Sequence, residues 1–360
     1  MLETAEEIYG PYEWGRYDLL VLPPSFPYGG MENPRLSFIT PSLLAGDRSL
    51  VSVIAHELAH SWSGNLVTNA TWRDGWLNEG MTSYIESRLM EIIYDAARVD
   101  EERVLNYREL LLDFERVPEP MQALAPRLDD ADPDGFQGTV HYHKGRMFLE
   151  HLEQAFGRDA FDAFLKSYFE EFAFGTITTE QFLDYLDVQL LAREGAPLTR
   201  AEAERWTYGP GLPDDVSLPS SANLEAAEAA ATAWAAGDAE LANIAVDDWS
   251  PQARIHFINS LPADLSLAKI RELDEAWQLS GSSNAEIGRT WFIQVASRRH
   301  EDAYDALEAY VNRHGRGRLV VPIYRALAEN GKDLGLAQAR FEQARSKYHP
   351  ATVSWVENSL

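Results

Sequence analysis

The chain has 360 residues, of which 45% are hydrophobic and 24% charged, a globular composition that excludes an intrinsically disordered chain. Its formal net charge of −26 would repel phosphate backbones and anionic bilayers, so we expect neither nucleic acid nor a membrane surface as a partner. Cysteine is absent, which excludes disulfides and thiolate chemistry and leaves histidine and carboxylate side chains to hold any metal.

The amino-terminal residues and the hydropathy predict a soluble protein. Residues 1–7 carry acidic side chains where a signal peptide carries lysine or arginine before an apolar core. No uninterrupted apolar run approaches the ~18 residues that a membrane helix needs. We therefore expect a chain that is not exported and that is located in the cytoplasm.

Two regions of different composition follow one another. In the first, only residues 17–22 and 36–39 have the pattern of strands, and the remainder is mostly helical. The Pro- and Gly-rich residues 209–221 predict a linker. Beyond the linker, a chain rich in Ala, Leu and Glu predicts helices over residues 222–236, 267–279, 283–298, 301–313 and 334–348. We expect a mainly α protein with a mixed domain over 1–208 and an all-helical domain of stacked helix pairs over 222–360.

A possible metal site begins at His56-Glu57-Leu58-Ala59-His60, within residues 50–63, which have helical apolar spacing and no proline. Residues four apart lie on one face of a helix, so both imidazoles can reach a single ion. Glu57 is rotated by about 100° from His56, which places it beside the ion, where a base could take a proton from water. The alternative is an ordinary buried helix whose two histidines only satisfy core contacts.

A third ligand is available on the next predicted helix. Catalytic zinc takes three protein ligands and keeps a fourth position open. Residues 76–94 form a second amphipathic segment that carries Glu79, and 19 positions separate Glu79 from His60. That spacing is long enough for a turn and an antiparallel return.

Six segments are more specific to one protein family than the HExxH spacing alone: residues 10–15, 19–34, 54–71, 76–84, 142–145 and 315–318. Together they resemble the zinc aminopeptidases of the gluzincin type, and within them the leukotriene A-4 hydrolase group and its bacterial aminopeptidase relatives. The resemblance extends over nearly the whole chain. It implies a thermolysin-like catalytic domain followed by an all-helical C-terminal domain.

The resemblance implies one zinc ion per chain, held by His56, His60 and Glu79, with Glu57 as the general base. Glu86 is similar to a family carboxylate that supports a zinc ligand. The resemblance also implies that residues 27–32 bind substrate: Pro27, Tyr28, Gly29, Gly30, Met31 and Glu32.

Among these residues Glu32 would set the mode of cleavage. In the family its counterpart pairs with the α-ammonium of the substrate, a contact that selects a free amino terminus. The glycines before it would allow a substrate backbone to approach closely and to pair as an added strand. Taken alone, Glu32 would be a solvated carboxylate in a turn.

The remaining predicted site residues come later in the chain. Tyr142 would donate a hydrogen bond to the oxyanion. Arg316, Gly317 and Arg318 match a basic segment that binds the peptide carboxylate in the family, although a solvated basic loop is an alternative. Asp134 aligns with the family's pocket acid, and its alternative is a turn aspartate.

Two departures from the family pattern affect the interpretation. The family carries an amino-terminal β-rich domain, whereas this sequence begins after it, so an uncovered apolar interface is expected. The eicosanoid-processing members have a tyrosine five residues before the position of Tyr142, where this chain has Gln137.

We therefore expect a zinc aminopeptidase that acts on peptides with a free amino terminus. Three alternatives stay open: a thermolysin-type endopeptidase, an epoxide hydrolase of the leukotriene A-4 hydrolase type, and a catalytically impaired fragment that acts as a binding module.

Overall fold

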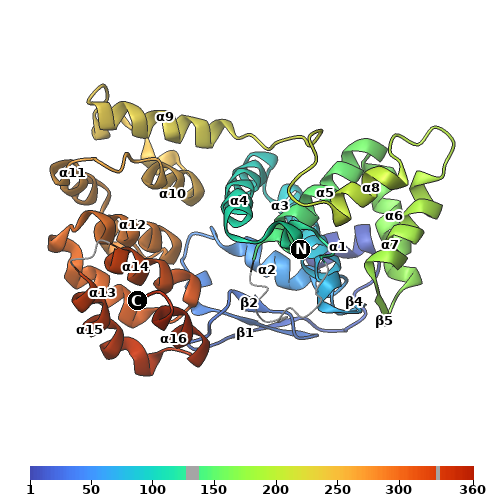
Figure 1. The fold of residues 1–360 in the computed structure, drawn as a ribbon, viewed down its shortest axis with the longest axis horizontal. Helices are drawn as coiled ribbons and strands as arrows, with labels where there is room; N and C mark the ends of the chain where they lie inside the picture. The colour runs from blue at the N-terminus through green and yellow to red at the C-terminus, as the bar shows by residue number, and fades with distance from the viewer. Residues whose placement is uncertain (127–137, 330–332) are drawn as a thin grey trace. The chain divides into compact units, whose positions relative to one another are not determined.

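The computed structural model describes residues 1–126, 138–329 and 333–360 (Figure 1). These residues form two compact units. The first unit comprises Met1–Asp18, Glu32–Ser37 and Ser52–Ser220, and the second comprises Leu19–Met31, Phe38–Val51 and Ser221–Leu360. The domain boundaries proposed above, 1–208 and 222–360 with a linker over 209–221, remain a prediction.

Helices make up most of the first unit, as predicted. They are α1 (Leu2–Tyr9), α2 (Val51–Ala59), α3 (Trp76–Ile93), α4 (Ala96–Arg116), α5 (Val140–Phe156), α6 (Arg158–Glu171), α7 (Thr179–Leu186) and α8 (Arg200–Tyr208).

The first unit is organised around α3, most of whose side chains are buried. This helix packs closely on α5, and the contact depends on two glycines. A Cβ atom on Gly80 would lie 2.6 Å from the carbonyl oxygen of His141 and 2.8 Å from Cα of Gly145. Only glycine permits this approach of two backbones. The crossing fixes the positions of the functional side chains that the two helices carry.

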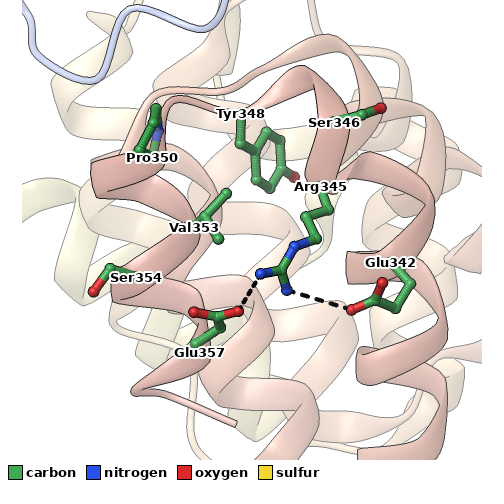
Figure 2. Close-up of a pocket in the computed structure, with 8 residues that line it drawn as sticks. All are labelled: Glu342, Arg345, Ser346, Tyr348, Pro350, Val353, Ser354 and Glu357. Carbon is green, nitrogen blue, oxygen red and sulfur yellow. Dashed lines mark ion pairs between the residues drawn. The ribbon is translucent and has the colours of Figure 1, made fainter.

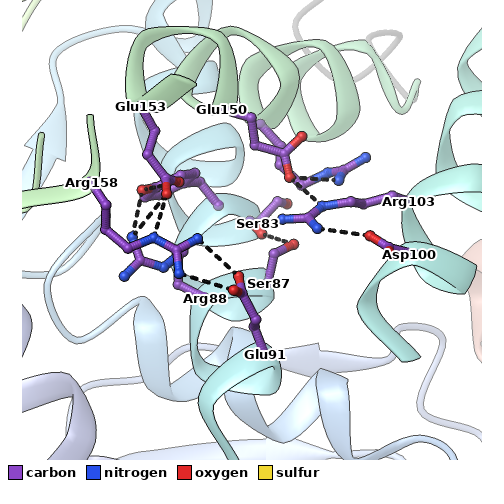
Figure 3. Close-up of polar contacts among 11 residues, drawn as sticks. Ser83, Ser87, Arg88, Glu91, Asp100, Arg103, Glu150, Glu153 and Arg158 are labelled. Atoms are coloured by element: carbon purple, nitrogen blue, oxygen red, sulfur yellow. Dashed lines mark hydrogen bonds and ion pairs between the residues drawn. The ribbon is translucent and has the colours of Figure 1, made fainter. Parts of the chain in front are cut away.

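Ion pairs tie the neighbouring helices to α3 and α5 (Figure 3). Arg158, at the start of α6, donates to Glu91 of α3 at 2.9 Å and to Glu153 of α5 at 2.6 Å. Arg103 of α4 donates to Glu150 of α5 at 2.7 Å. Both α5 carboxylates are largely buried, so salt screens these pairs less than pairs on the surface.

Lys144 of α5 is completely buried and binds main-chain carbonyl groups. Its Nζ donates to the carbonyl oxygens of Gln122, at 2.9 Å, and Gly209, at 2.6 Å. Burial lowers the pKa of Lys144 from 10.5 to about 7. A neutral amine has two N–H groups, which matches the two carbonyl acceptors.

This burial predicts a pH dependence of stability. Between pH 7 and 9 the unfolded lysine keeps its proton while the folded lysine loses it, so the unfolding free energy should rise with pH. The contribution is at most about 1.4 kcal/mol per pH unit, and Lys144→Met should lack it. Urea unfolding of both proteins at pH 7, 8 and 9 measures the difference. Parallel pH profiles for the two proteins would contradict the prediction.

The strands predicted at residues 17–22 and 36–39 are confirmed as β1 (Asp18–Val21) and β3 (Leu36–Ile39). Between them lies β2 (Gly30–Met31), which pairs antiparallel with β3 so that Gly30 faces Ile39 and Met31 faces Phe38. The strand order is β1-β3-β2, so β2 is an edge strand of this sheet.

The expectation that the first region has only two strands is wrong. Besides β2, the strands β4 (Val67–Asn69) and β5 (Gly175–Ile177) pair in parallel. Strands of two or three residues are too short to show an alternating pattern, so the sequence did not indicate them.

On β1, the side chains of Leu19, Leu20 and Val21 are exposed by 39%, 44% and 44%.

Helices make up most of the described residues of the second unit. Its helices are α9 (Ala222–Ala236), α10 (Pro251–Asn259), α11 (Leu267–Trp277), α12 (Ala285–Arg298), α13 (Tyr304–Arg313), α14 (Gly317–Glu329), α15 (Leu334–Ala344) and α16 (Pro350–Glu357). The five helices predicted here are confirmed within a few residues. Helix α9 packs on α10, and α14 packs on both α12 and α16, consistent with stacked helices (Figure 1). No described helix has the length and apolarity needed to cross a membrane.

Candidate metal centre

Helix α2 presents both histidines of the HExxH segment on one face. The amide of His60 donates to the carbonyl of His56 at 3.2 Å, which keeps the helical spacing although α2 ends at Ala59. The two imidazole rings are 4.8 Å apart between centroids and nearly perpendicular. The expected helix over residues 50–63 is therefore too long, because Ser61 and Trp62 bond to carbonyls three residues back.

Glu79, in the first turn of α3, completes a set of three ligand groups. Its Oε2 lies 3.2 Å from Nε2 of His56 and 3.4 Å from Nε2 of His60. One ligand atom from each of the three residues lies within 4.8 Å of the other two. The structure therefore brings together the three residues that the sequence pattern proposed as ligands.

Neighbouring polar groups, one side chain and one main-chain carbonyl, lie within hydrogen-bond distance of the two Nδ1 atoms. Nδ1 of His56 lies 2.9 Å from the Glu86 carboxylate, the partner that the resemblance implied. Nδ1 of His60 lies 3.0 Å from the carbonyl oxygen of Ser63, which also accepts from the hydroxyl of Thr82 at 3.2 Å. When both Nδ1 atoms donate, both Nε2 lone pairs are left for a metal.

Thr82 and Ser63 were not predicted from the sequence. Thr82 lies one helical turn after Glu79, so its spacing could have placed it on the same face of α3. The role of Ser63 comes from a main-chain carbonyl, for which the residue type gives no signal.

These groups fit a divalent cation such as Zn²⁺. Two neutral imidazoles and one carboxylate are a common protein ligand set for catalytic zinc. Both histidines have acceptors at Nδ1, as metal-bound histidines almost always do. His60 is 1% exposed, and its burial shields the centre from water on that side.

Glu57 lies next to this cluster without being part of the triad. It is 5% exposed, and burial raises the pKa of its carboxyl to about 7. A carboxyl in such surroundings can exchange a proton near neutral pH. The side chain is therefore suited to act as a general base, as the sequence predicted.

Glu32 lies close to the same residues. Its carboxylate, that of Glu57 and a ring nitrogen of His60 form a second group with ligand atoms within 4.8 Å of one another. The carbonyl oxygen of Glu32 accepts from Nδ2 of Asn65 at 2.7 Å, which fixes the backbone there. Glu32 is therefore a negative charge beside the predicted base and not an isolated turn residue.

Tyr142, in the first turn of α5, lies against His56, one of the candidate ligands. Its ring stacks on His56 with a centroid distance of 6.0 Å and an interplanar angle of 20°. Burial, reinforced by Glu79, raises the pKa of Tyr142 well above its usual value of 10. The hydroxyl therefore keeps its proton and can donate a hydrogen bond.

Residues 27–31 lie in the second unit. Pro27 is buried and Tyr28 is half exposed. The carbonyl of Gly29 accepts from the amide of Thr40 at 3.0 Å, and Gly30 and Met31 form the edge strand β2. An edge strand has unpaired main-chain groups that a peptide could bind by strand addition.

Arg316, Gly317 and Arg318 also belong to the second unit. The guanidinium groups of Arg316 and Arg318 lie 3.7 and 3.9 Å from carboxylate oxygens of Glu286. Burial lowers the pKa of Arg316 to about 10. The alternative of a solvated basic loop is wrong for Arg316, whose side chain is 14% exposed. Asp134 and Gln137 lie outside the described residues.

Comparison with known proteins finds a matching family model for each of the two parts of the chain. Residues 1–199 match the family model described as Peptidase family M1 domain, and residues 249–360 match Leukotriene A4 hydrolase, C-terminal. Aminopeptidase B of Rattus norvegicus is 36% identical over 378 residues, covering 100% of this chain and 58% of the relative. Leukotriene A-4 hydrolase of Xenopus laevis is 36% identical over 369 residues, covering 100% and 60%.

A solved structure confirms the predicted fold class. Yeast leukotriene A4 hydrolase in complex with bestatin has a TM-score of 0.91 at 34% identity, covering 100% of this chain and 61% of that one. The chain thus spans about three-fifths of the length of these relatives. The predicted resemblance is confirmed.

Proposed function

The chain belongs to peptidase family M1, and from that premise we propose that it is a zinc-dependent aminopeptidase that removes single residues from the amino ends of peptides. One Zn²⁺ per chain would be held by His56, His60 and Glu79. When bound there, the ion would polarise the scissile carbonyl and lower the pKa of water to about 7. The observation that carries the proposal is that two groups of possible ligand atoms share His60: one with His56 and Glu79, the other with Glu57 and Glu32.

Each protein group near the cluster has a chemical task in this proposal. Glu57 takes a proton from the attacking water and returns it to the leaving amine, for which its raised pKa suits it. Tyr142, which stays protonated, donates its hydroxyl hydrogen bond to the developing oxyanion. Glu86 and Thr82 keep the two imidazoles oriented.

Glu32 gives the reaction its preference for the end of a peptide. Its carboxylate would pair with the α-ammonium of the first residue and so hold the first peptide bond over the metal. An internal peptide bond brings no positive charge to this position. We also propose that residues 27–31, which include edge strand β2, contact the substrate. Arg316, Gly317 and Arg318 would bind its carboxylate. Asp134 would be the acid of the pocket for the first side chain.

A panel of aminoacyl anilides with free and acetylated amino groups tests the proposal. We expect release of product from the free amines only. Equal cleavage of both forms would favour an endopeptidase. A lipid epoxide is assayed beside the panel, and its turnover without amide hydrolysis would favour an epoxide hydrolase. A zinc-loaded chain that cleaves nothing in the panel would favour a binding module.

Replacement of Glu32 is a more specific test of exopeptidase action. Glu32→Ala should raise KM for free-amine substrates and lower kcat/KM by roughly 10²-fold, because a charge-assisted contact that orients the substrate is lost. Steady-state kinetics together with zinc content measure the effect. Asn33→Ala, at the neighbouring position, is the control. An unchanged kcat/KM in Glu32→Ala would contradict the assignment.

We also propose that the apolar side chains of β1 are the surface that the amino-terminal β domain of the family covers. The exposure of Leu19 and Val21 supports this proposal, because these two apolar side chains share one face of the strand and are costly in water when uncovered.

A further inference from the structure

The segment that precedes Glu32 is anchored within the second unit by the turn before α14. The amide of Gly315 donates to the carbonyl of Pro24 at 2.9 Å. A Cβ atom on Gly315 would lie 2.8 Å from that oxygen and 2.9 Å from Cα of Ser25, so the two backbones are in direct contact. The hydroxyl of Thr352, in α16, donates in turn to the carbonyl of Gly315 at 3.0 Å.

An aromatic contact continues this anchor towards edge strand β2. The ring of Trp355, also in α16, packs on the backbone of Gly317, where a Cβ atom would lie 2.4 Å from Cε3 of the indole. The same indole meets Tyr28 edge to face at a centroid distance of 6.3 Å. Tyr28 is 50% exposed, so burial alone does not fix it, and its ring contacts are with Trp355 and Phe26.

Tyr28 is directly joined to the residues that would bind substrate. Gly29 follows it, then Gly30 and Met31 of β2, and the next residue in the chain is Glu32. Two adjacent glycines give this segment large conformational freedom, which must be restricted before substrate can pair with the strand. Pairing with β3 and the bond from Thr40 to Gly29 restrict part of this segment, and the contacts at Tyr28 restrict its amino-terminal end.

We propose that Trp355 is a positioning residue for substrate binding, acting through Tyr28 on the edge formed by residues 28–31. This inference rests on the proposed aminopeptidase function and assigns a part in it to the C-terminal helix. It also explains the glycines of Gly315-Arg316-Gly317-Arg318 by packing: Gly315 admits the backbone at Pro24, and Gly317 admits the indole.

The test is a comparison of kinetic constants for variants of α16. Trp355→Ala should raise KM for a free-amine aminoacyl anilide about 3- to 10-fold, the range expected for loss of an aromatic pair, with kcat within about twofold of wild type. Trp355→Phe keeps a ring against Tyr28 and should retain most of the affinity. Zinc content should be unchanged in both.

A matched control lies on the same helix. Val353 lines a separate open pocket of about 520 Å³ with Arg345, Tyr348 and Ser354 (Figure 2). Val353→Ala removes apolar volume from α16 without touching the contact with Tyr28, so KM should stay at the wild-type value. An equal rise of KM in Val353→Ala would show that general loosening of α16 is the cause and would overturn the inference.

A double-mutant cycle with Tyr28 tests the path of action. If Trp355 acts through Tyr28, the double variant Tyr28→Ala/Trp355→Ala should have the KM of Tyr28→Ala alone. Multiplicative effects would overturn the inference. If Trp355→Ala does not fold, Trp355→Leu, which keeps apolar volume on Gly317, takes its place in the cycle. If the wild type cleaves no substrate, both the proposed function and this inference are wrong. If the wild type is active and the KM of Trp355→Ala is unchanged, only this inference is wrong.

Discussion

Glu57→Gln is expected to lower kcat for aminoacyl bond hydrolysis by about 10²- to 10⁴-fold, the range for loss of a general base, while zinc content stays at the wild-type level. Glutamine has nearly the same shape as glutamate but cannot accept a proton from water at neutral pH. Glu57 is also outside the proposed ligand triad, so the His56, His60 and Glu79 groups that would hold the metal are left in place.

Steady-state kinetics and metal analysis on the same preparation would distinguish loss of the general base from loss of the metal. Glu91→Gln is the matched control, because it removes a carboxylate from the same unit whose partner is Arg158 and not the metal cluster. Its kcat should remain within about threefold of wild type, as expected for one partly exposed ion pair. A Glu57→Gln enzyme with near-normal turnover would contradict the assignment of Glu57 as the base.

The proximity of the three proposed ligands could be predicted from sequence, because local geometry determines most of it. An HExxH segment on a helix places both imidazoles on one face whatever surrounds the helix. Glu79 required only that the next helix return antiparallel. The groups that orient the proposed ligands were harder to predict from the sequence. Glu86 came from the family resemblance, whereas Thr82 and the carbonyl of Ser63 depend on how α3 meets the end of α2.

The helices that were not predicted from the sequence have similar physical reasons for going unrecognised. Helix α14 was not predicted, since it begins at Gly317 and contains Pro322, both of which usually oppose a helix. Helices α10 and α16 have proline at their first position. A proline usually indicates the end of a helix or a loop, unless the N-cap residue before it is recognised. The close approach of Gly80 and Gly145 and the burial of Lys144 arise from tertiary packing, which a single sequence does not display.

Glu79→Ala is expected to have the other large effect, which is loss of the metal. The Glu79 carboxylate lies within 3.4 Å of both Nε2 atoms and is the negative charge of the triad. Without it, two neutral imidazoles remain, which is one ligand fewer than catalytic zinc takes. We expect zinc content below half of the wild-type value after dialysis, and hydrolysis reduced to background.

Glu86→Gln provides a graded comparison for this prediction. It leaves all three ligands in place and weakens only the hydrogen bond at Nδ1 of His56, so zinc affinity should fall by about 10- to 100-fold. Titration against a competing chelator would then rank the affinities as wild type, Glu86→Gln and Glu79→Ala. Added zinc should restore hydrolysis in Glu86→Gln but not in Glu79→Ala. If Glu79→Ala bound zinc as tightly as wild type, a different residue would be the third ligand, and α3 would not complete the centre.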